Sequence, residues 1–311
     1  MKPIVTLTLN PSIDESSEAE VVRPVRKTRT HNQRYDPGGG GINVARVAAE
    51  LGAPASAIYF AGGATGSLLD ALLRGRGFEP KRIEIAGNTR ISHMIFETST
   101  GLEYRFVPEG PEIQEHECNT CLAALDRMSF DFLVASGSLP RQIAPTFYVR
   151  VGEIARRKGA KFILDTSGLA LEKTLGAGGV YLAKPSLGEF EHLVGRSLAD
   201  ERAQEEAALE LVKRGAVSLL AVTLGRDGAF LASERGIRRI AAMPVEARSA
   251  VGAGDSFLAG MTVGLAQGME VEEAFIYGMA AGTAAVLTRG TELCRRADVE
   301  RLFAELKARE G

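Results

Sequence analysis

The stretch Ala250-Val251-Gly252-Ala253-Gly254-Asp255-Ser256-Phe257 stands directly before an apolar run that continues to Leu265 and has the composition of a buried helix. Glycines here let successive backbone N–H groups gather around one spot, and the start of a helix adds a positive partial charge. Such a site attracts phosphate. Asp255 follows the glycines, where a carboxylate is placed to accept a proton from a substrate hydroxyl. These features suit phosphoryl transfer to an alcohol, although the motif alone also fits a glycine-rich turn capped by an aspartate.

The composition is that of an ordinary globular protein. Of 311 residues, 45% are hydrophobic and 24% are charged, and the formal net charge of −2 comes without a long run of one sign. This length allows one large core with a small satellite. The chain shows no basic stripe, no apolar run of membrane-spanning length and no signal-peptide pattern. We therefore expect no nucleic-acid or membrane partner and a cytoplasmic location.

Cysteine and histidine do not indicate a metal centre. Cys118 and Cys121 have CxxC spacing, but they lie within a helical pattern and no second pair completes a zinc site. We predict that these two cysteines and Cys294 are structural. The four histidines are scattered and show no ligand spacing.

Short apolar runs alternate with helical patterns along most of the chain. This alternation predicts an α/β fold with a doubly wound, mainly parallel sheet and helices on both faces. The predicted strands are 4–9, 55–60, 132–135, 161–164, 180–183, 218–223 and 229–232, with an edge strand near 237–242. The predicted helices are 42–51, 67–75, 115–128, 144–158, 187–194, 201–214, 256–267, 271–287 and 297–308.

Two segments interrupt the alternation. Residues 15–35 are polar and favour β-structure, and residues 83–107 contain a hairpin pattern around Ser99-Thr100-Gly101. We expect them to form a small β lid, spanning about 15–35 and 88–108, inserted in a single domain of residues 1–311.

Several polar or glycine residues follow predicted strands. In an open α/β sheet, ligands bind at the carboxyl ends of the strands, so we expect these residues to share one site. They are Asp14, Gly38 to Gly41, Ser138, Asp165, Lys184, Gly225 and Asp255.

Two signatures carry a family resemblance. PGGGGINVARVAAELG at 37–52 and SAVGAGDSFLAG at 249–260 resemble the ribokinase-like (PfkB) sugar kinases. TLTLNPSID at 6–14, EYRFVPEGPEI at 103–113, ASGSLP at 135–140 and AAGTAAVLTRGTELC at 280–294 are similar to the 6-phosphofructokinase branch of that family. Gly40 stands where 1-phosphofructokinases usually have lysine, which favours the same branch.

The resemblance implies an ATP-dependent kinase that phosphorylates the C1 hydroxyl of fructose 6-phosphate. Tagatose-6-phosphate kinase and 1-phosphofructokinase are the alternatives within the family, since epimers at C4 differ only in the direction of one hydroxyl. A non-catalytic sugar-phosphate sensor on the same fold is an alternative of another class. That alternative predicts a broken Asp255 or anion hole, and both are intact.

The resemblance also implies roles for individual residues. Asp255 would be the catalytic base, and Gly252, Ala253 and Gly254 would form the anion hole for the migrating phosphoryl group. Sugar hydroxyls would be held by Asp14, Gly38, Gly39 and Asn43. The existing phosphate of the substrate would be bound by Arg90 and Ser138, with Lys27 between the sugar and the ATP phosphates.

On the nucleotide side, the resemblance implies ATP contacts from Lys184, Ser186, Thr223, Gly225, Gly228, Met279 and Thr283. Glu189 would position Mg²⁺ through water, and Asp165 would join that network. A potassium site would be formed by Ser249, Val251, Ala285, Thr288 and Gly290. Related lids pair between subunits, so a homodimer through the lid is expected.

The chain departs from the family pattern at four positions. Ser186 replaces the asparagine of the NxxE element, which puts the Mg²⁺ contact and inhibition by a second ATP in doubt. Ala250 replaces a usual threonine, and Arg141 follows Ser138-Leu139-Pro140 where the family has proline and glycine. Glu292 stands where a relative has arginine. None of these changes removes the base or the anion hole.

Overall fold

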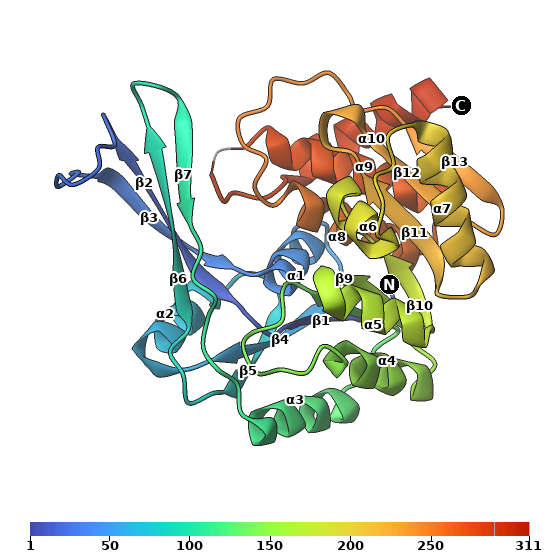
Figure 1. Cartoon of the computed structure of the whole chain (residues 1–311), viewed down its shortest axis with the longest axis horizontal. Coiled ribbons are helices and arrows are strands. Elements are labelled where there is room, and N and C mark those ends of the chain that lie inside the picture. Colours follow the sequence, from blue (N-terminus) through green and yellow to red (C-terminus); the bar gives the residue numbers. More distant parts are fainter. Residues whose placement is uncertain (289, 311) are drawn as a thin grey trace.

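The computed structural model describes residues 1–288 and 290–310. The described chain forms a nine-stranded sheet between two layers of helices, with a separate four-stranded sheet projecting from one side (Figure 1). In spatial order, the strands of the large sheet are β13 (Gly236–Ile240), β12 (Ala229–Ser233), β11 (Val217–Thr223), β10 (Val180–Ala183), β9 (Lys161–Asp165), β8 (Phe132–Ser136), β1 (Ile4–Thr8), β4 (Ala55–Ala61) and β5 (Glu79–Glu84). The α/β prediction is confirmed.

The direction of chain progression across the large sheet reverses between β1 and β8. From β1 the chain passes outward to β4 and β5, whereas β8 to β11 follow in order on the other side. These seven strands are parallel, and β12 and β13 add an antiparallel edge. Ligands of open α/β sheets bind where the strand order reverses. The ends of β1 and β8 therefore mark the expected position of the site.

Side chains alternate between the two faces of the large sheet. On β8, Phe132 and Val134 pack into the core on one face, and Leu133 and Ala135 pack into the core on the other. The first face is covered by α1 (Gly40–Glu50), α8 (Ala253–Gln267), α9 (Val271–Val286) and α10 (Arg296–Glu310). The second is covered by α3 (Glu115–Arg127), α4 (Phe147–Arg157), α5 (Gly168–Ala177), α6 (Leu187–Val194) and α7 (Glu201–Lys213).

Helix α8 is buried along almost its whole length, which fixes the position of its N-terminus. Its residues from Ser256 to Ala266 are all buried. It packs closely on α9, because a Cβ at Gly260 would lie 2.6 Å from the Cβ of Ala281. A helix held this firmly presents its first turn to the end of the sheet with little freedom to move.

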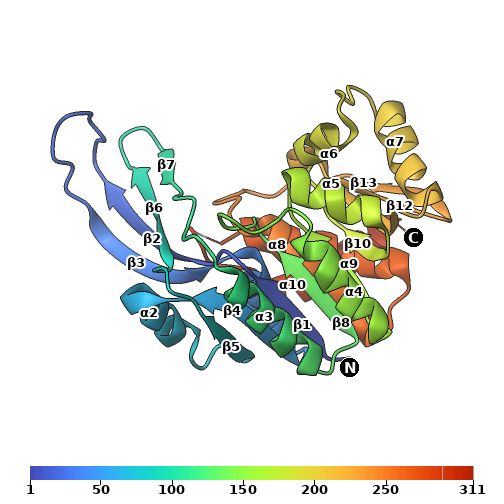
Figure 2. The ribbon, with the colours of Figure 1, turned by 60° about the horizontal axis from the view of Figure 1, so that its bottom comes forward.

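The four-stranded sheet, which we call the lid, has the order β3 (His31–Gly38), β2 (Ser12–Ala19), β6 (Arg90–Glu97) and β7 (Leu102–Phe106). Strands β2 and β6 run parallel, and the other two pairs are antiparallel. The lid leans away from the body of the molecule (Figure 2). At its base, Ile13 packs with Ile42 of α1 and with Leu69 and Leu73 of α2 (Gly63–Leu73). This small core joins the lid to the body.

Several segments differ from the prediction; helix α2, for example, spans Gly63–Leu73 rather than 67–75. Residues 79–84 form β5, an edge strand paired with β4 of the large sheet, so 83 and 84 do not belong to the lid. The polar sequence of β5, which includes Pro80, gives little strand signal but suits an edge. Helix α5 was not predicted, because it begins at a glycine and no side chain caps it. Helix α8 begins at Ala253 rather than 256, which places Asp255 in its first turn.

Cys118, Cys121 and Cys294 are buried and free, as predicted for structural cysteines.

Within residues 1–288 and 290–310, every helix is too short or too polar to cross a membrane.

Candidate active site

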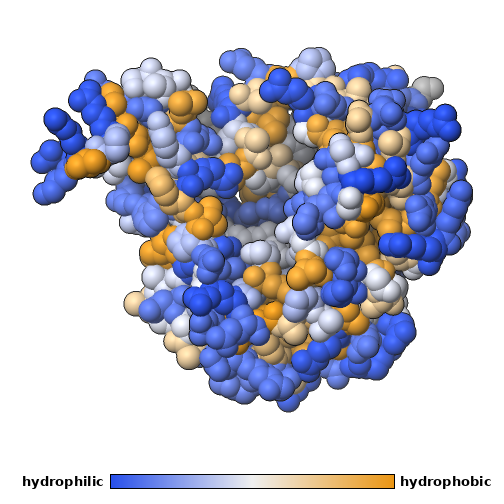
Figure 3. Space-filling view, in the orientation of Figure 1, coloured by the Kyte–Doolittle hydropathy of each residue, from blue (hydrophilic) through white to orange (hydrophobic). Residues whose placement is uncertain are grey.

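A cavity of about 450 Å³ lies between the lid and the carboxyl ends of the strands of the large sheet. The hollow opens to the surface between the lid and the body (Figure 3). Its walls come from the lid, the start of α1, the ends of β8, β9 and β10, and the start of α8. Asp14, Asn43, Arg90, Ser138, Asp165, Lys184 and Asp255 all line it. Residues separated by up to 241 positions in the chain therefore meet at the place expected from the sheet order.

The first turn of α8 forms one wall of the cavity. Gly252 is the N-cap and has a φ of 75°, a left-handed conformation that favours glycine. A Cβ at this position would also lie 2.5 Å from the Leu293 side chain. The backbone N–H groups at the start of a helix have no partner within the helix. Ala253 N makes only a long hydrogen bond to Ala250 O, at 3.4 Å, which an anion bound in the cavity can displace.

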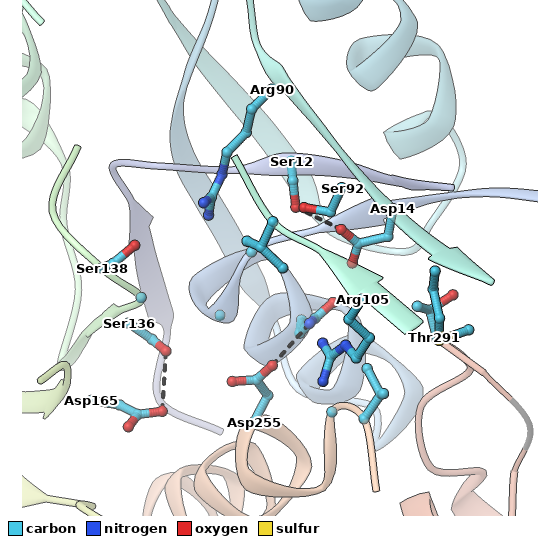
Figure 4. A pocket seen from close by; sticks show the side chains of 18 of the residues that line it. Ser12, Asp14, Arg90, Ser92, Arg105, Ser136, Ser138, Asp165, Asp255 and Thr291 are labelled. Carbon is cyan, nitrogen blue, oxygen red and sulfur yellow. Dashed lines mark hydrogen bonds between the residues drawn. The ribbon is translucent and has the colours of Figure 1, made fainter. Parts of the chain in front are cut away.

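Asn43 and Asp255 both line the cavity and are bonded to each other, and Figure 4 shows Asp255 in the cavity wall. Asn43 Nδ2 donates to Asp255 Oδ2 at 2.8 Å. Asn43 comes from the first turn of α1, which begins within the glycine run at Gly40, and Asp255 comes from the first turn of α8. The two family signatures thus contact each other directly, although they are 212 residues apart.

The environment of Asp255 favours a proton acceptor that works near neutral pH. Burial raises the pKa of Asp255 to about 7, and the charge of Asp165 adds to this, while Asn43 and Lys184 oppose it. A general base is most effective when its pKa lies near the working pH. The carboxylate can then take a proton and release it again without a large energetic cost.

Lys184 and Asp165 form an ion pair beside Asp255. Lys184 Nζ lies 3.2 Å from Asp165 Oδ1, and Ser136 Oγ donates to Asp165 Oδ2 at 3.2 Å. Burial lowers the pKa of Lys184, but the facing carboxylates of Asp165, Asp255 and Glu189 outweigh this effect and raise it above its ordinary value. The lysine therefore carries a positive charge next to the N-terminus of α8, since a Cβ at Gly254 would lie 3.3 Å from its Nζ.

The opposite wall of the cavity combines Asp14 with the glycine run. Ser12 Oγ donates to Asp14 Oδ1 at 2.6 Å. A Cβ at Gly38 would lie 2.3 Å from Asp14 Oδ2, and one at Gly40 would lie 2.2 Å from Ser136 Oγ. Gly39 has a φ of 117°, which side chains other than glycine rarely adopt. The glycines thus leave room for the polar groups that surround the cavity.

Arg90 is held by backbone carbonyls rather than by carboxylates. Its Nη1 donates to Pro108 O at 2.8 Å, its Nη2 to Asn10 O at 2.8 Å and its Nε to Pro11 O at 3.4 Å. A guanidinium has five N–H donors, so two remain for a ligand. Asn10 also donates from its side chain to Ser138 Oγ at 3.4 Å. Arg90 and Ser138 are therefore anchored to the same residue at the end of β1.

Other site residues predicted from the sequence lie away from this cavity. Lys27 is exposed in the connection between β2 and β3 and does not line it. Thr223, Gly225 and Gly228 lie at and beyond the end of β11, where Thr223 N donates to Pro185 O at 3.1 Å. Further predicted residues outside the cavity wall are Met279 and Thr283, one turn apart on α9.

Ser186 and Glu189 form a capping box at the start of α6. Ser186 N and Ser186 Oγ both donate to Glu189 Oε2 at 2.8 Å, and Glu189 N donates back to Ser186 Oγ at 3.4 Å. Glu189 also lines the cavity. Ser186 therefore holds the carboxylate of Glu189 in place, and the Ser186 hydroxyl is already hydrogen-bonded within the capping box.

The residues predicted to bind potassium lie in the loop before α8, in the last turn of α9 and in the loop that follows α9. Ser249 Oγ donates to Gly290 O at 3.1 Å, and Val251 N donates to Ser249 Oγ at 3.2 Å. Thr288 Oγ1 donates to Ala285 O at 2.7 Å. Searched without residues 289 and 311, the chain has no group of three or more His, Cys, Asp or Glu side chains that could enclose a metal ion.

Sequence reasoning missed several polar residues of the cavity. Arg105 and Ser92 line it from the lid, and Thr291 lines it from the loop after α9. Arg105 pairs with Met94, and Ser92 pairs with Asp14, so all four side chains share one face of the lid. Arg105 lies between Tyr104 and Phe106, and this alternation indicates that Arg105 points to the opposite face of the strand from its two neighbours. Which face of the lid borders the cavity depends on the pairing of strands that are distant in the sequence.

Comparison with known proteins agrees with this geometry. Residues 7–298 match the family described as pfkB family carbohydrate kinase. The chain belongs to this family. It is 45% identical, over 302 residues, to the ATP-dependent 6-phosphofructokinase isozyme 2 of Mycobacterium tuberculosis, a match that covers 96% of this chain and 88% of the relative.

Solved structures of pfkB family members have the same fold. Phosphofructokinase-2 from Escherichia coli in complex with potassium matches with a TM-score of 0.95 and 36% identity, over 99% of this chain and 100% of that one. The same enzyme in complex with fructose-6-phosphate matches with a TM-score of 0.93 and 35% identity, over 99% and 100%. This chain is accordingly a sugar kinase, a phosphotransferase with an alcohol acceptor.

Proposed function

We propose that this protein transfers the γ-phosphoryl group of ATP to the C1 hydroxyl of fructose 6-phosphate, giving fructose 1,6-bisphosphate and ADP. The observation that supports this most strongly is the placement of Asp255. Its carboxylate lies at the start of α8, next to the glycine backbone and facing a cavity whose far wall carries Asp14 and Arg90. The family relatives with this name support the choice of substrate.

The chemical step needs a base and a stabilised phosphoryl group. Asp255 accepts the proton of the C1 hydroxyl as the oxygen forms a bond to the γ-phosphorus. The bond from that phosphorus to the bridging oxygen breaks, and the electron pair leaves with ADP. The N–H groups of Gly252, Ala253 and Gly254 donate to the oxygens of the migrating group, and Lys184 adds positive charge beside them.

The other end of the cavity suits a sugar phosphate. Arg90 has two free donors for the 6-phosphate, and Ser138 adds a hydroxyl. Asp14, Asn43 and the backbone of Gly38 and Gly39 then meet the sugar hydroxyls. The proposed contact of Lys27 remains a prediction, since the residue does not line the cavity.

We propose that ATP lies along the ends of β10 and β11 and over α9. Lys184 and Ser186 would meet the phosphates, and Thr223, Gly225, Gly228, Met279 and Thr283 would border the ribose and base. Mg²⁺, which neutralises phosphate charge, is usually held by one or two carboxylates, water and the phosphates themselves. Glu189 fits this role because the capping box uses only its Oε2. Asp165 would support that network from beside Lys184.

We also propose a potassium ion between the two loops that carry Ser249 and Gly290. Val251 lies in the first of these loops, Thr288 lies in the second, and Ala285 lies in the last turn of α9. Backbone carbonyl and hydroxyl oxygens suit a large monovalent cation, and each carbonyl that accepts one hydrogen bond keeps a second lone pair. Such an ion would hold in place the backbone of Gly252, which adjoins these loops.

The lid suggests a homodimer. Tyr35, Leu102 and Phe106 share the lid face opposite Asp14, by the strand pairing, and they are 40%, 57% and 57% exposed. Hydrophobic side chains interrupt the hydrophilic surface of the lid in Figure 3. We propose that a second copy covers this face, which would also protect the open edges of the lid.

We also propose that the protein is located in the cytoplasm.

A steady-state assay with MgATP tests the substrate. It compares kcat/KM for fructose 6-phosphate, tagatose 6-phosphate and fructose 1-phosphate. A preference of about tenfold or more, which is about 1.4 kcal/mol of transition-state binding, supports fructose 6-phosphate. A preference for fructose 1-phosphate would instead assign the protein to the 1-phosphofructokinase activity.

A further inference from the structure

Arg46 lies behind the Asn43–Asp255 pair. It stands three residues after Asn43 on α1, so the two side chains are neighbours on one face of the helix. Arg46 Nη1 donates to Asn43 Oδ1 at 3.1 Å and to the backbone carbonyl of Pro37 at 3.1 Å. Asn43 Nδ2 donates in turn to Asp255 Oδ2 at 2.8 Å. A continuous chain of hydrogen bonds therefore runs from the guanidinium to the carboxylate.

This chain of hydrogen bonds fixes which way the amide of Asn43 points. An amide can present either its oxygen or its nitrogen to a neighbour, but a guanidinium carries only donors. Arg46 therefore requires the amide oxygen, and the nitrogen must face Asp255. A donor that faces a carboxylate stabilises its ionised form, which is the form that accepts a proton. The bond occupies Oδ2 and leaves Oδ1 to meet a substrate hydroxyl.

The surroundings of Arg46 do not offer it a simple structural partner. In residues 1–288 and 290–310, no carboxylate lies within 4.0 Å of its guanidinium nitrogens. Burial lowers the pKa of Arg46, and the charge of Arg76 adds to this. The carboxylates of Asp36, Asp14 and Asp255 oppose the shift without reversing it, so holding the guanidinium here has an energetic cost. The hydrogen bonds of Arg46 to Asn43 and Pro37 offset this cost.

We propose that Arg46 is a positioning residue for the catalytic base, which acts by fixing the Asn43 amide so that Asp255 is held ionised and aimed at the acceptor hydroxyl. This inference rests on the proposed function, because it takes Asp255 as the base. The other charged groups around Asp255 are Asp165 from β9, Lys184 from β10 and Asp14 from β2. They come from other elements, so they remain in place when Arg46 is changed.

The central variant is Arg46→Met, which keeps an unbranched apolar stem but removes every donor. We expect kcat for fructose 6-phosphate to fall by about tenfold or more, because the base is no longer aligned. The KM values for both substrates should change by less than about threefold, since Arg46 does not line the cavity. Arg46→Lys keeps the charge and a donor and should recover most of kcat.

The pH dependence separates this role from a merely structural one. Without Arg46 the amide is free to turn its oxygen toward Asp255, which favours the protonated carboxyl. The acidic limb of the kcat profile should therefore move to higher pH in Arg46→Met. The matched control is Arg76→Met. Arg76 and Arg46 line a second cavity, separate from the active-site cavity, but Arg76 is exposed and donates through Nε to the carbonyl of Leu72. Its profile should equal that of the wild type.

A double-variant cycle with Asn43→Ala completes the test. If Arg46 acts through Asn43, then Arg46→Met should cost little further activity in the Asn43→Ala background. An equal loss in both backgrounds, or an unmoved acidic limb, would overturn the proposal. If Arg46→Met does not fold, as judged by circular dichroism, Arg46→Gln serves instead and should move the limb in the same direction by less. An inactive wild type would overturn the proposed function itself, whereas an active wild type with an unaffected Arg46→Met would overturn only this inference.

Discussion

Lys184 Nζ lies 3.2 Å from Asp165 Oδ1, and the two side chains are only 7% and 14% exposed. This ion pair sits at the ends of two neighbouring parallel strands, β9 and β10, directly beside the start of α8. It places one buried positive charge among the three carboxylates of Asp165, Asp255 and Glu189. Lys184 therefore balances part of the negative charge of the site.

Replacing Lys184 alone should destabilise the fold. Lys184→Met leaves Asp165 buried without its partner, and the loss of one member of a buried pair typically costs about 3 to 5 kcal/mol. Denaturant unfolding measures this free energy. The double variant Lys184→Met/Asp165→Asn should recover part of the loss, because the buried charge is then absent. Equal stability of the wild type and Lys184→Met would show that the pair is not coupled to folding.

The activity should decline in mildly acidic solution. Burial and the charge of Asp165 raise the pKa of Asp255 to about 7. Since only the ionised carboxylate accepts a proton, kcat/KM should fall as the pH drops through this value and should level off above it. Asp165→Asn removes one of the two causes, so any residual activity should show the acidic limb at lower pH. A wild-type limb near pH 4, the range of an ordinary aspartate, would contradict the described environment of Asp255.

Gly38→Ala should weaken sugar binding more than it weakens folding. The new Cβ would lie 2.3 Å from Asp14 Oδ2, so the carboxylate must move away from the cavity wall. We expect KM for fructose 6-phosphate to rise by about tenfold, while KM for ATP stays the same, because one hydrogen bond to a charged group is lost. Gly176→Ala is the matched control, since a Cβ there meets nothing within 4 Å. Equal rises in both KM values would argue against a sugar-binding role of Asp14.

The proposed dimer can be tested on the lid. Phe106→Glu puts a charge on the apolar lid face and should shift the protein to a monomer in sedimentation analysis, because burying an unpaired charge is costly. Leu169→Glu is the control, as Leu169 is similarly exposed, at 58%, but lies on α5. A wild type that sediments as a monomer at every concentration would refute the lid dimer.

The sequence predicted best those parts of the site that are built from neighbouring residues. The segment from Gly252 to Asp255 lies within one turn of α8, so its sequence alone determines how its N–H groups and carboxylate are arranged. The same holds for the glycine run at the start of α1. The family resemblance implied separate roles for Asn43 and Asp255 but no contact between them, and the structure shows that contact as a hydrogen bond.

The parts that were missed depend on distant pairing or on competing roles. Arg105 enters the cavity because β7 pairs with β6 in one register, and a shift by one residue would turn it to the outer face. Ser186 and Glu189 match the S-x-x-E pattern of a capping box, and the structure shows this local role. The sequence analysis had assigned these residues to ATP and Mg²⁺, roles that remain proposals.

The most direct test of the central claim is the turnover of fructose 6-phosphate by the wild type and by Asp255→Asn, with the product identified by phosphorus NMR. Asparagine keeps the shape of the side chain and an acceptor for Asn43 Nδ2, but it cannot take a proton. The account predicts that the wild type forms fructose 1,6-bisphosphate and that kcat of Asp255→Asn falls by roughly 10²- to 10⁴-fold while the protein remains folded. Full activity of Asp255→Asn would contradict the assignment of the base.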